Sequence, residues 1–178
     1  MNHENLWAPW RMAYLRELSA RQDRAAGAVP PKPVNFLRAY WESPQHDEQN
    51  LVVLRTDDGL VLLNRYPYAN GHLMACLGEA RPCLADYEPS QRAAFWRLVE
   101  TAAELARLTL DPQGLNIGIN EGAAAGAGLP EHVHAHVVPR WNGDTNFMAA
   151  VGGIRVNPDS LEAMAAEYRR TIARLGGL

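Results

Sequence analysis

The apolar positions of this chain repeat with two different periods, and the period predicts which segments are strands. Residues 51–55 and 60–64 are apolar runs, and the segment between them, TDDG, ends in the Asp-Gly pair that is a strong hairpin signal. Residues 72–76 form a third apolar run after a loop that contains proline and an Asn-Gly turn pair. Three such strands make an antiparallel meander, which needs cover on at least one face.

A helical period governs residues 90–109. Apolar residues recur there every three or four positions: Phe95, Leu98, Val99, Ala102, Leu105, Ala106 and Leu108. Ser90 can cap this helix, or Pro89 can occupy its first turn, and Asp111-Pro112 follows its end. The helix is the expected cover for the sheet, with Trp96 expected in the core.

The remaining segments complete an α+β fold. Residues 35–42 predict a short helix, residues 115–120 a fourth strand, and residues 160–175 a closing helix capped by Asp159 or Ser160. Residues 19–35 are polar and then rich in Ala, Gly and Pro, which is typical of an extended connection. The aromatic residues of segment 6–15 are expected to pack on the domain or on another subunit. We expect one domain over residues 1–178, with residues 1–35 as an N-terminal extension and linker.

A row of three histidines lies in the segment 131–148. His132, His134 and His136 stand two residues apart, so a strand projects all three from one face, while the intervening apolar residues face the other way. The segment is therefore the expected fifth strand of a mainly antiparallel sheet. A row of this kind has three explanations: a purely structural role, a metal site built from imidazole nitrogens, or nucleophilic catalysis at phosphorus.

The loop before the histidines, residues 120–130, consists mainly of glycine and alanine. Gly126 and Gly128 allow a positive φ and let backbone N–H groups approach a phosphate closely. The N–H groups of Ala127, Gly128 and Leu129 are the candidate donors. A flexible turn without a ligand has the same composition, and the neighbouring histidines favour the phosphate interpretation.

Composition sets limits on the partners of this chain. Its 178 residues are 47% hydrophobic and 21% charged, with a net charge of −3, so bulk charge does not indicate nucleic-acid binding. We see no run of 18 apolar residues, as a membrane span would need, and no secretory signal at the start. The two cysteines are too few for a disulfide framework, so the cytoplasm is the expected location.

The sequence resembles the histidine triad (HIT) superfamily of nucleotide hydrolases and transferases. HVHAHVV fits the His-x-His-x-His-x-x signature with apolar residues at x. The segments LWAPWRMAYL, LLNRYPYANGHLM and VVPRWNGDTNFM resemble the branch of bacterial diadenosine tetraphosphate phosphorylases and related HIT hydrolases. The resemblance extends from about residue 6 to the final helix and implies a HIT-like fold.

This resemblance implies a role for each triad histidine. His134 is the expected nucleophile, which attacks the α-phosphorus of a nucleotide and forms a nucleotidyl-histidine. His132 is the expected partner that orients the ring of His134. His136 is the expected contact to a phosphate oxygen and a proton route to the leaving group.

The resemblance also implies a set of nucleotide-binding residues. They are Asn64 for the ribose, Asn120 for phosphate or ribose, Phe36 and Leu62 for the base pocket, and Arg140 for the distal phosphates. Each has an ordinary structural explanation as well, such as core packing for Leu62 and a solvated side chain for Arg140. His72 matches a family histidine that we interpret as structural.

Two departures from the family pattern limit these expectations. Many relatives carry a zinc-binding Cys-x-x-Cys whose positions correspond here to Val34 and Leu37, and the histidine that completes such a site falls near Ala80. We therefore expect no metal site. Leu129 stands where relatives place Gln or Ser, which removes a side-chain contact to the leaving group.

The leading functional hypothesis is a nucleotide hydrolase or transferase that cleaves a dinucleoside polyphosphate or phosphoramidate, with water or phosphate as the acceptor. The alternatives are a nucleotide-binding regulatory module with little turnover and a metal-binding triad. No cofactor is required, although a divalent cation could accompany the nucleotide. A homodimer is expected, and a tetramer would add an interface for which Trp7 and Trp10 are suspects. Neither nucleic acid nor a membrane is an expected partner.

Overall fold

The computed structural model describes residues 35–144 and 158–177. The aromatic segment 6–15, with Trp7 and Trp10, and the expected connection up to Val34 lie outside these residues. The described residues belong to one compact unit, Asn35–Leu178.

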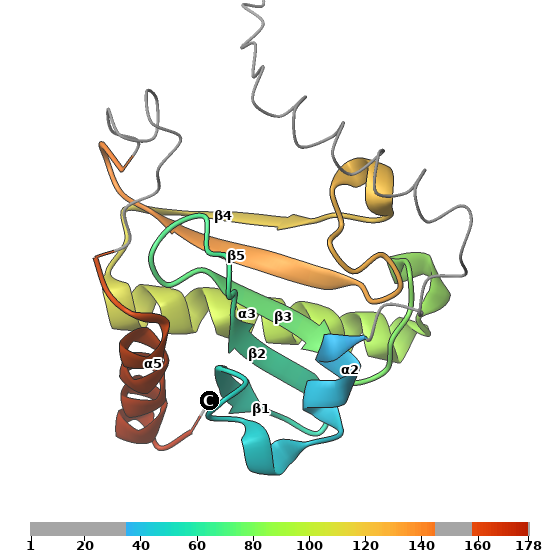
Figure 1. Ribbon diagram of the computed structural model, residues 1–178, viewed down its shortest axis with the longest axis horizontal. Coiled ribbons are helices and arrows are strands. Elements are labelled where there is room, and N and C mark those ends of the chain that lie inside the picture. The colour runs from blue at the N-terminus through green and yellow to red at the C-terminus, as the bar shows by residue number, and fades with distance from the viewer. Residues whose placement is uncertain (1–34, 145–157, 178) are drawn as a thin grey trace, which may run out of the picture. The chain divides into compact units, whose positions relative to one another are not determined.

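One antiparallel sheet carries the fold (Figure 1). Its strands are β1 (Val52–Arg55), β2 (Gly59–Leu63), β3 (Leu73–Leu77), β4 (Gly114–Ile119) and β5 (His134–Arg140), in the order β1-β2-β3-β5-β4. Each neighbouring pair is antiparallel. The expected five-stranded α+β architecture is thereby confirmed, with the histidine strand β5 between β3 and the edge strand β4.

Two helices cover one face of the sheet. They are the long helix α3 (Pro89–Leu110) and the C-terminal helix α5 (Leu161–Leu175), and both contribute to the larger apolar core. Pro89 occupies the first turn of α3, while a capping box between Glu88 and Gln91, not Ser90, satisfies its first N–H groups. Trp96 is 45% exposed, so its expected place in the core was wrong: it lies on the outer face of α3.

Tyr168 joins α5 to a loop beside the histidines. Its ring is fully buried in the larger core, and its hydroxyl donates a hydrogen bond of 2.7 Å to the carbonyl oxygen of Gly71. Gly71 has φ +73° and immediately precedes His72, so the closing helix helps to hold the turn that leads into β3.

The other face of the sheet carries the short helix α2 (Phe36–Trp41) and a second apolar cluster (Figure 1). This cluster consists of Leu37, Val52, Leu60, Leu62, Met74, Cys76 and Leu129. His134 pairs with Cys76 and His136 with Met74, so the two histidines share this face with the cluster. We call it the histidine face.

The strand of the histidines begins later than expected. β5 starts at His134, and His132 lies in the turn before it, where its N–H donates to the carbonyl of Leu129 at 3.2 Å. The expectation that one strand carries all three histidines was therefore wrong for His132. Its backbone is not held by the ladder of the sheet.

The first hairpin turns one residue earlier than the Asp-Gly signal indicated. The N–H of Thr56 donates to the carbonyl of Gly59 at 3.0 Å, so Asp57 and Asp58 form the turn and Gly59 begins β2. Gly59 is needed for space. A Cβ there would lie 2.1 Å from the carbonyl oxygen of Cys76 and 2.8 Å from Cα of Leu77, both backbone atoms of β3.

We expect Gly59→Ala to lower the free energy of unfolding by about 1–3 kcal/mol, because the added methyl forces β2 and β3 apart. The matched control is Gly114→Ala at the start of β4, where an added Cβ meets nothing within 4 Å. The control is expected to change stability by less than about 0.5 kcal/mol. Denaturant unfolding of both variants measures the difference, and equal losses would contradict the packing argument.

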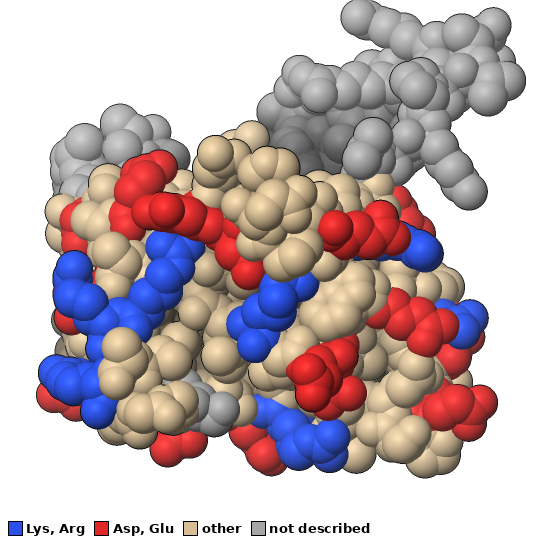
Figure 2. Space-filling view, turned by 90° about the horizontal axis from the view of Figure 1, so that it is seen from below, with Lys and Arg blue, Asp and Glu red and all other residues tan. Residues whose placement is uncertain are grey.

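Charges of both signs are mixed on the surface. On the face drawn in Figure 2, acidic and basic side chains of the described residues alternate and do not gather by sign. None of the described helices has the length and apolar character that crossing a membrane demands.

Candidate functional site

The candidate site lies on the histidine face, over β5 and its two neighbours, β3 and β4. Gly118 of β4 pairs with His136, and nothing lies within 4 Å of the position that a Cβ of Gly118 would take. The missing side chain therefore leaves room beside the histidines. A substrate could occupy that room without displacing any described side chain.

His134 is held as the tautomer that a nucleophile needs. It is 5% exposed, and its Nδ1 lies 2.8 Å from the main-chain carbonyl oxygen of His132. A carbonyl oxygen only accepts, so Nδ1 carries the proton and Nε2 of the neutral ring keeps its lone pair. Burial lowers the pKa of His134, while its hydrogen bond to His132 opposes this effect. The neutral ring is therefore the dominant form near pH 7.

A chain of hydrogen bonds sets the opposite tautomer at His136. The backbone N–H of Tyr68 donates to Nδ1 of His72 at 3.1 Å, so the proton of a neutral His72 is on Nε2. That Nε2 lies 3.0 Å from Nδ1 of His136 and donates to it. The proton of a neutral His136 is then on its own Nε2, which is the donor a departing oxygen requires.

His136 is a neutral donor at physiological pH. Burial, followed by repulsion from a protonated His134, lowers the pKa of His136 to about 4. The ring centroids of His134 and His136 are 5.0 Å apart in an edge-to-face arrangement. The ring with the bare nitrogen and the ring with the N–H group are thus neighbours, which suits attack on a group whose leaving atom needs a proton.

His72 is a residue of the candidate site that the sequence interpretation assigned only a structural role. It is fully buried, and its ring bridges the 66–68 loop to His136. The available signal was its position: it directly precedes β3 and has the same parity as Met74, which pairs with His136. That parity predicts a place on the histidine face.

Both ring nitrogens of His132 face oxygen atoms of the protein. It is fully buried, with Nε2 2.8 Å from the carbonyl oxygen of Leu77 and Nδ1 3.0 Å from Oδ1 of Asn35. Burial lowers the pKa of His132, and its hydrogen bond with Leu77 opposes this. Of the three triad residues, His132 is the one with both ring nitrogens in contact with oxygen atoms of the protein.

The fold brings both expected asparagines to the histidines. Asn64 follows β2, its N–H donates to the carbonyl of His72 at 2.9 Å, and its Oδ1 accepts from the N–H of Tyr66 at 2.8 Å. Asn120 follows β4, whose last residue, Ile119, pairs with Ala135. Asn120 is therefore the next residue along from the pair beside His134.

The small-residue loop adopts a short 3-10 turn, Ala123–Ala125, which Gly126 ends with φ +92°. The N–H of Ala127 donates to the carbonyl of Gly122 at 3.3 Å, so this candidate donor is partly used within the loop. The N–H groups of Gly128 and Leu129 have no partner among the residues the structure describes. They remain the better candidates for a phosphate oxygen.

The expected base-pocket residues differ in accessibility. Phe36 of α2 is 37% exposed and packs edge-on against Tyr40, so its ring is open to a ligand. Leu62 is 1% exposed and packs in the second apolar cluster, together with the side chain of Leu129. Leu62 is thus part of the packed apolar cluster on the histidine face.

The side chain of Arg140 already has partners within the protein. Its guanidinium forms an ion pair with Asp144 through two nitrogens and donates to Oδ1 of Asn116 at 2.8 Å. The hydrogen bond to Asp144 raises the pKa of Arg140. A distal phosphate would have to compete with the carboxylate of Asp144 for this cation.

The positions that hold zinc in relatives do not fit a metal here. Leu37 is fully buried in the second apolar cluster, and both ring nitrogens of His132 face oxygens of the protein. Within the described ranges, no group of three or more His, Cys, Asp or Glu side chains is placed to hold a metal ion.

A row of alternating histidines on an antiparallel sheet, with one bare imidazole nitrogen, defines a histidine triad protein. Residues 45–143 match the family model of the HIT domain, more than half of the chain, and the chain belongs to the HIT family. Over 172 residues it is 37% identical to a protein of Mycobacterium tuberculosis named AP-4-A phosphorylase, covering 94% of this chain and 85% of the relative. The expectation of a HIT-family enzyme is confirmed.

Two further comparisons support the family assignment. The chain is 31% identical over 93 residues to a Schizosaccharomyces pombe protein named bis(5'-nucleosyl)-tetraphosphatase (asymmetrical), covering 52% of this chain and 50% of that protein. A zinc-bound histidine triad family protein from Mycobacterium smegmatis superposes with a TM-score of 0.62 and 28% identity, covering 78% of this chain and 94% of that one.

Proposed function

We propose that this protein is a nucleotidyl hydrolase or phosphorylase that cleaves a dinucleoside polyphosphate at its α-phosphate through a covalent nucleotidyl-His134 intermediate. The observation that carries the proposal is the 2.8 Å contact between Nδ1 of His134 and the carbonyl oxygen of His132, which leaves Nε2 bare. The AP-4-A phosphorylase of Mycobacterium tuberculosis, similar over nearly the whole chain, supports the substrate class.

In the proposed reaction, Nε2 of His134 attacks the α-phosphorus, and the bond from phosphorus to the bridging oxygen breaks. Nε2–H of His136 hydrogen-bonds to the departing oxygen and supplies a proton where the leaving group needs one. In the second half, water or phosphate attacks the same phosphorus and the phosphorus–nitrogen bond breaks. His134 is regenerated, and the product is a nucleoside monophosphate or diphosphate respectively.

The binding residues divide the work with the histidines. Asn64 and Asn120 are the proposed contacts to ribose and phosphate, Phe36 the contact to the base, and the N–H groups of Gly128 and Leu129 the donors to nonbridging oxygens. Fixed donors of this kind stabilise charge that develops in the transition state.

We also propose that residues 1–178 form one domain and that the protein is cytoplasmic. The two cysteines, Cys76 and Cys83, are both free thiols, which fits a reducing compartment.

The test is a panel of nucleotide substrates with identified products, run with and without added phosphate. Release of AMP and ATP from diadenosine tetraphosphate supports hydrolysis, and release of ADP and ATP only with phosphate supports phosphorolysis. Tight nucleotide binding without turnover under either condition would contradict the enzyme proposal and favour a regulatory binding module.

We also propose a homodimer formed along β4 and the outer face of α3. Within the described sheet, β4 pairs only with β5, so its other edge carries unpaired backbone groups. Beside this edge, Trp96, Leu108 and Ile117 are each 45–47% exposed and border one groove of about 620 Å³. A second copy placed there would extend the sheet and cover the apolar groove.

Ile117→Glu is expected to convert the wild-type dimer to a monomer at micromolar concentration, because it places a charge in the apolar groove. Light scattering measures the mass. The matched control is Leu175→Glu at the end of α5, a residue that is 46% exposed and distant in sequence from β4. A monomeric wild-type protein, or equal dissociation by both variants, would reject this interface.

A further inference from the structure

The ring of Tyr68 lies against the two histidines that set the proton donor of the site. Its centroid is 4.8 Å from that of His72 and 5.9 Å from that of His136, and the ring planes are tilted by 35° and 36°. The centroids of His72 and His136 are themselves 5.1 Å apart. One aromatic ring therefore contacts both partners of the hydrogen bond from Nε2 of His72 to Nδ1 of His136.

The Tyr68 ring stands between this hydrogen bond and the surface. His72 is fully buried, whereas Tyr68 is 50% exposed. Main-chain groups hold the loop that carries the ring: the N–H of Tyr68 donates to Nδ1 of His72, and the carbonyl of Gly71 accepts from the hydroxyl of Tyr168. A change confined to the Tyr68 side chain leaves both of these bonds available, so the contribution of the ring can be measured separately from that of the loop.

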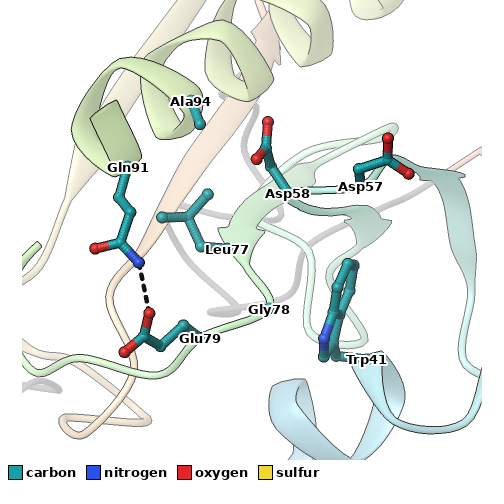
Figure 3. A pocket seen from close by; sticks show the side chains of 8 residues that line it. All are labelled: Trp41, Asp57, Asp58, Leu77, Gly78, Glu79, Gln91 and Ala94. Atoms are coloured by element: carbon teal, nitrogen blue, oxygen red, sulfur yellow. Dashed lines mark hydrogen bonds between the residues drawn. The ribbon is translucent and has the colours of Figure 1, made fainter. Parts of the chain in front are cut away.

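The leaving group of the proposed reaction is expected to pass His136, because the opposite direction from His134 is acidic. Beyond Cys76, which pairs with His134, strand β3 leads to a pocket of about 220 Å³ (Figure 3). Three carboxylates line this pocket, those of Asp57, Asp58 and Glu79. Because like charges repel, a polyphosphate chain is disfavoured there, and the direction that remains leads past His136 and Tyr68.

The groups packed around His136 come from three strands and one loop. They are His134 on β5, Met74 on β3, Gly118 on β4, and Tyr68 and His72 from the loop before β3. Further along β5, the cation of Arg140 is paired with the carboxylate of Asp144. The pKa of His136 is lowered to about 4, first by burial and then by repulsion from a protonated His134. An aromatic ring that covers His136 contributes to this burial.

We propose that Tyr68 is a positioning residue for proton donation to the leaving group. Its ring holds His136 against His72 and keeps water from the hydrogen bond between them, so that the imidazole of His136 stays neutral and its Nε2–H stays directed at the departing oxygen. Tyr68 acts through these two histidines. The inference rests on the proposed function and gives the side chain of Tyr68 a task that its main-chain N–H cannot perform.

Tyr68→Ala and Tyr68→Phe separate the ring from its hydroxyl group. Both variants retain the main-chain N–H that donates to His72. For Tyr68→Ala we expect kcat with diadenosine tetraphosphate to fall about 10- to 100-fold, as small misplacements of a reacting group do, with KM changed less than about 2-fold. Tyr68→Phe keeps the ring against both histidines, so its kcat is expected within about 3-fold of the wild-type value.

An NMR titration of the histidine rings gives a second readout, which does not depend on turnover. In the free wild-type protein, the Hε1 resonance of His136, identified by its absence in His136→Ala, should titrate near pH 4. Tyr68→Ala should raise this midpoint by about one pH unit or more, because water then stabilises the imidazolium. The matched control is Tyr66→Ala, which removes a ring of the same loop that is 84% exposed. This control should leave both the midpoint and kcat unchanged.

A folded Tyr68→Ala variant with either wild-type kcat or an unchanged His136 midpoint would overturn the proposal. So would a Tyr68→Phe variant as impaired as Tyr68→Ala, because it would show that the ring is not what matters. Equal effects of Tyr66→Ala and Tyr68→Ala would show a response of the whole loop and would also overturn it. If the wild-type protein turned over no nucleotide, the proposed function would fail, and the midpoint would still decide whether Tyr68 covers His136.

Discussion

His134→Ala is expected to reduce turnover of a dinucleoside polyphosphate by a factor on the order of a million, because it removes the only atom that bonds to phosphorus in the proposed reaction. Nucleotide binding should survive within a few-fold, since the asparagines and loop N–H groups that bind the substrate remain. Steady-state kinetics measures the first effect and isothermal titration calorimetry the second. The wild-type protein should also trap α-labelled nucleotide in an acid-labile, alkali-stable bond.

The matched control for this variant is His46→Ala, which removes an exposed histidine of the short 3-10 helix Pro44–His46. Its turnover should equal that of the wild-type protein. Thermal unfolding of both variants separates loss of chemistry from loss of fold, since His134 is buried and leaves a cavity. Wild-type turnover by His134→Ala, or label on a different residue, would contradict the covalent mechanism.

His136→Ala is expected to lower kcat by about 10²–10⁴-fold on a substrate with a poor leaving group, because it removes the Nε2–H donor. The loss should shrink as the leaving group becomes a more stable anion. A series of aryl esters of AMP, from phenol to nitrophenol, measures this. A plot of log(kcat/KM) against the pKa of the leaving group should have a steeper negative slope in the variant than in the wild-type protein.

His72→Gln should steepen the same plot to a smaller extent, because His136 then loses the hydrogen bond from His72 that sets its tautomer. His46→Ala should leave the slope unchanged. A variant with a large, uniform loss across all esters would show that His136 binds the phosphate equally well throughout the series and does not protonate the leaving atom.

The elements of this fold follow from local patterns, and those patterns are visible in the sequence. Strands β1 to β5 and helices α2, α3 and α5 all appear within a few residues of their expected positions, because apolar periodicity reports which face of each segment is buried. Four details differ from the expectation. Two are local, since the hairpin turns at Asp57-Asp58 and Glu88 caps α3. The other two depend on tertiary context: His132 precedes the strand, and Trp96 faces outward.

The chemistry of the site depends on contacts between residues far apart in the chain, which no local pattern encodes. The family motif in the sequence leads to the prediction that His134 is the nucleophile. It does not predict that His132 contacts the carbonyl oxygen of Leu77, nor that His72 contacts His136 across 64 positions of sequence. Both contacts arise where separate elements meet on the histidine face, so they required the three-dimensional structure.

The hydrogen bond from Tyr168 to Gly71 has a consequence for the synthesis of this protein. The ribosome completes the histidine strand well before it reaches Tyr168, and the turn that leads into His72 is secured only when that tyrosine arrives. A nascent chain that ends after β5 would carry every triad histidine and still lack the hydroxyl that bonds to the turn before His72. The closing helix must therefore be synthesised before this turn gains its hydrogen bond.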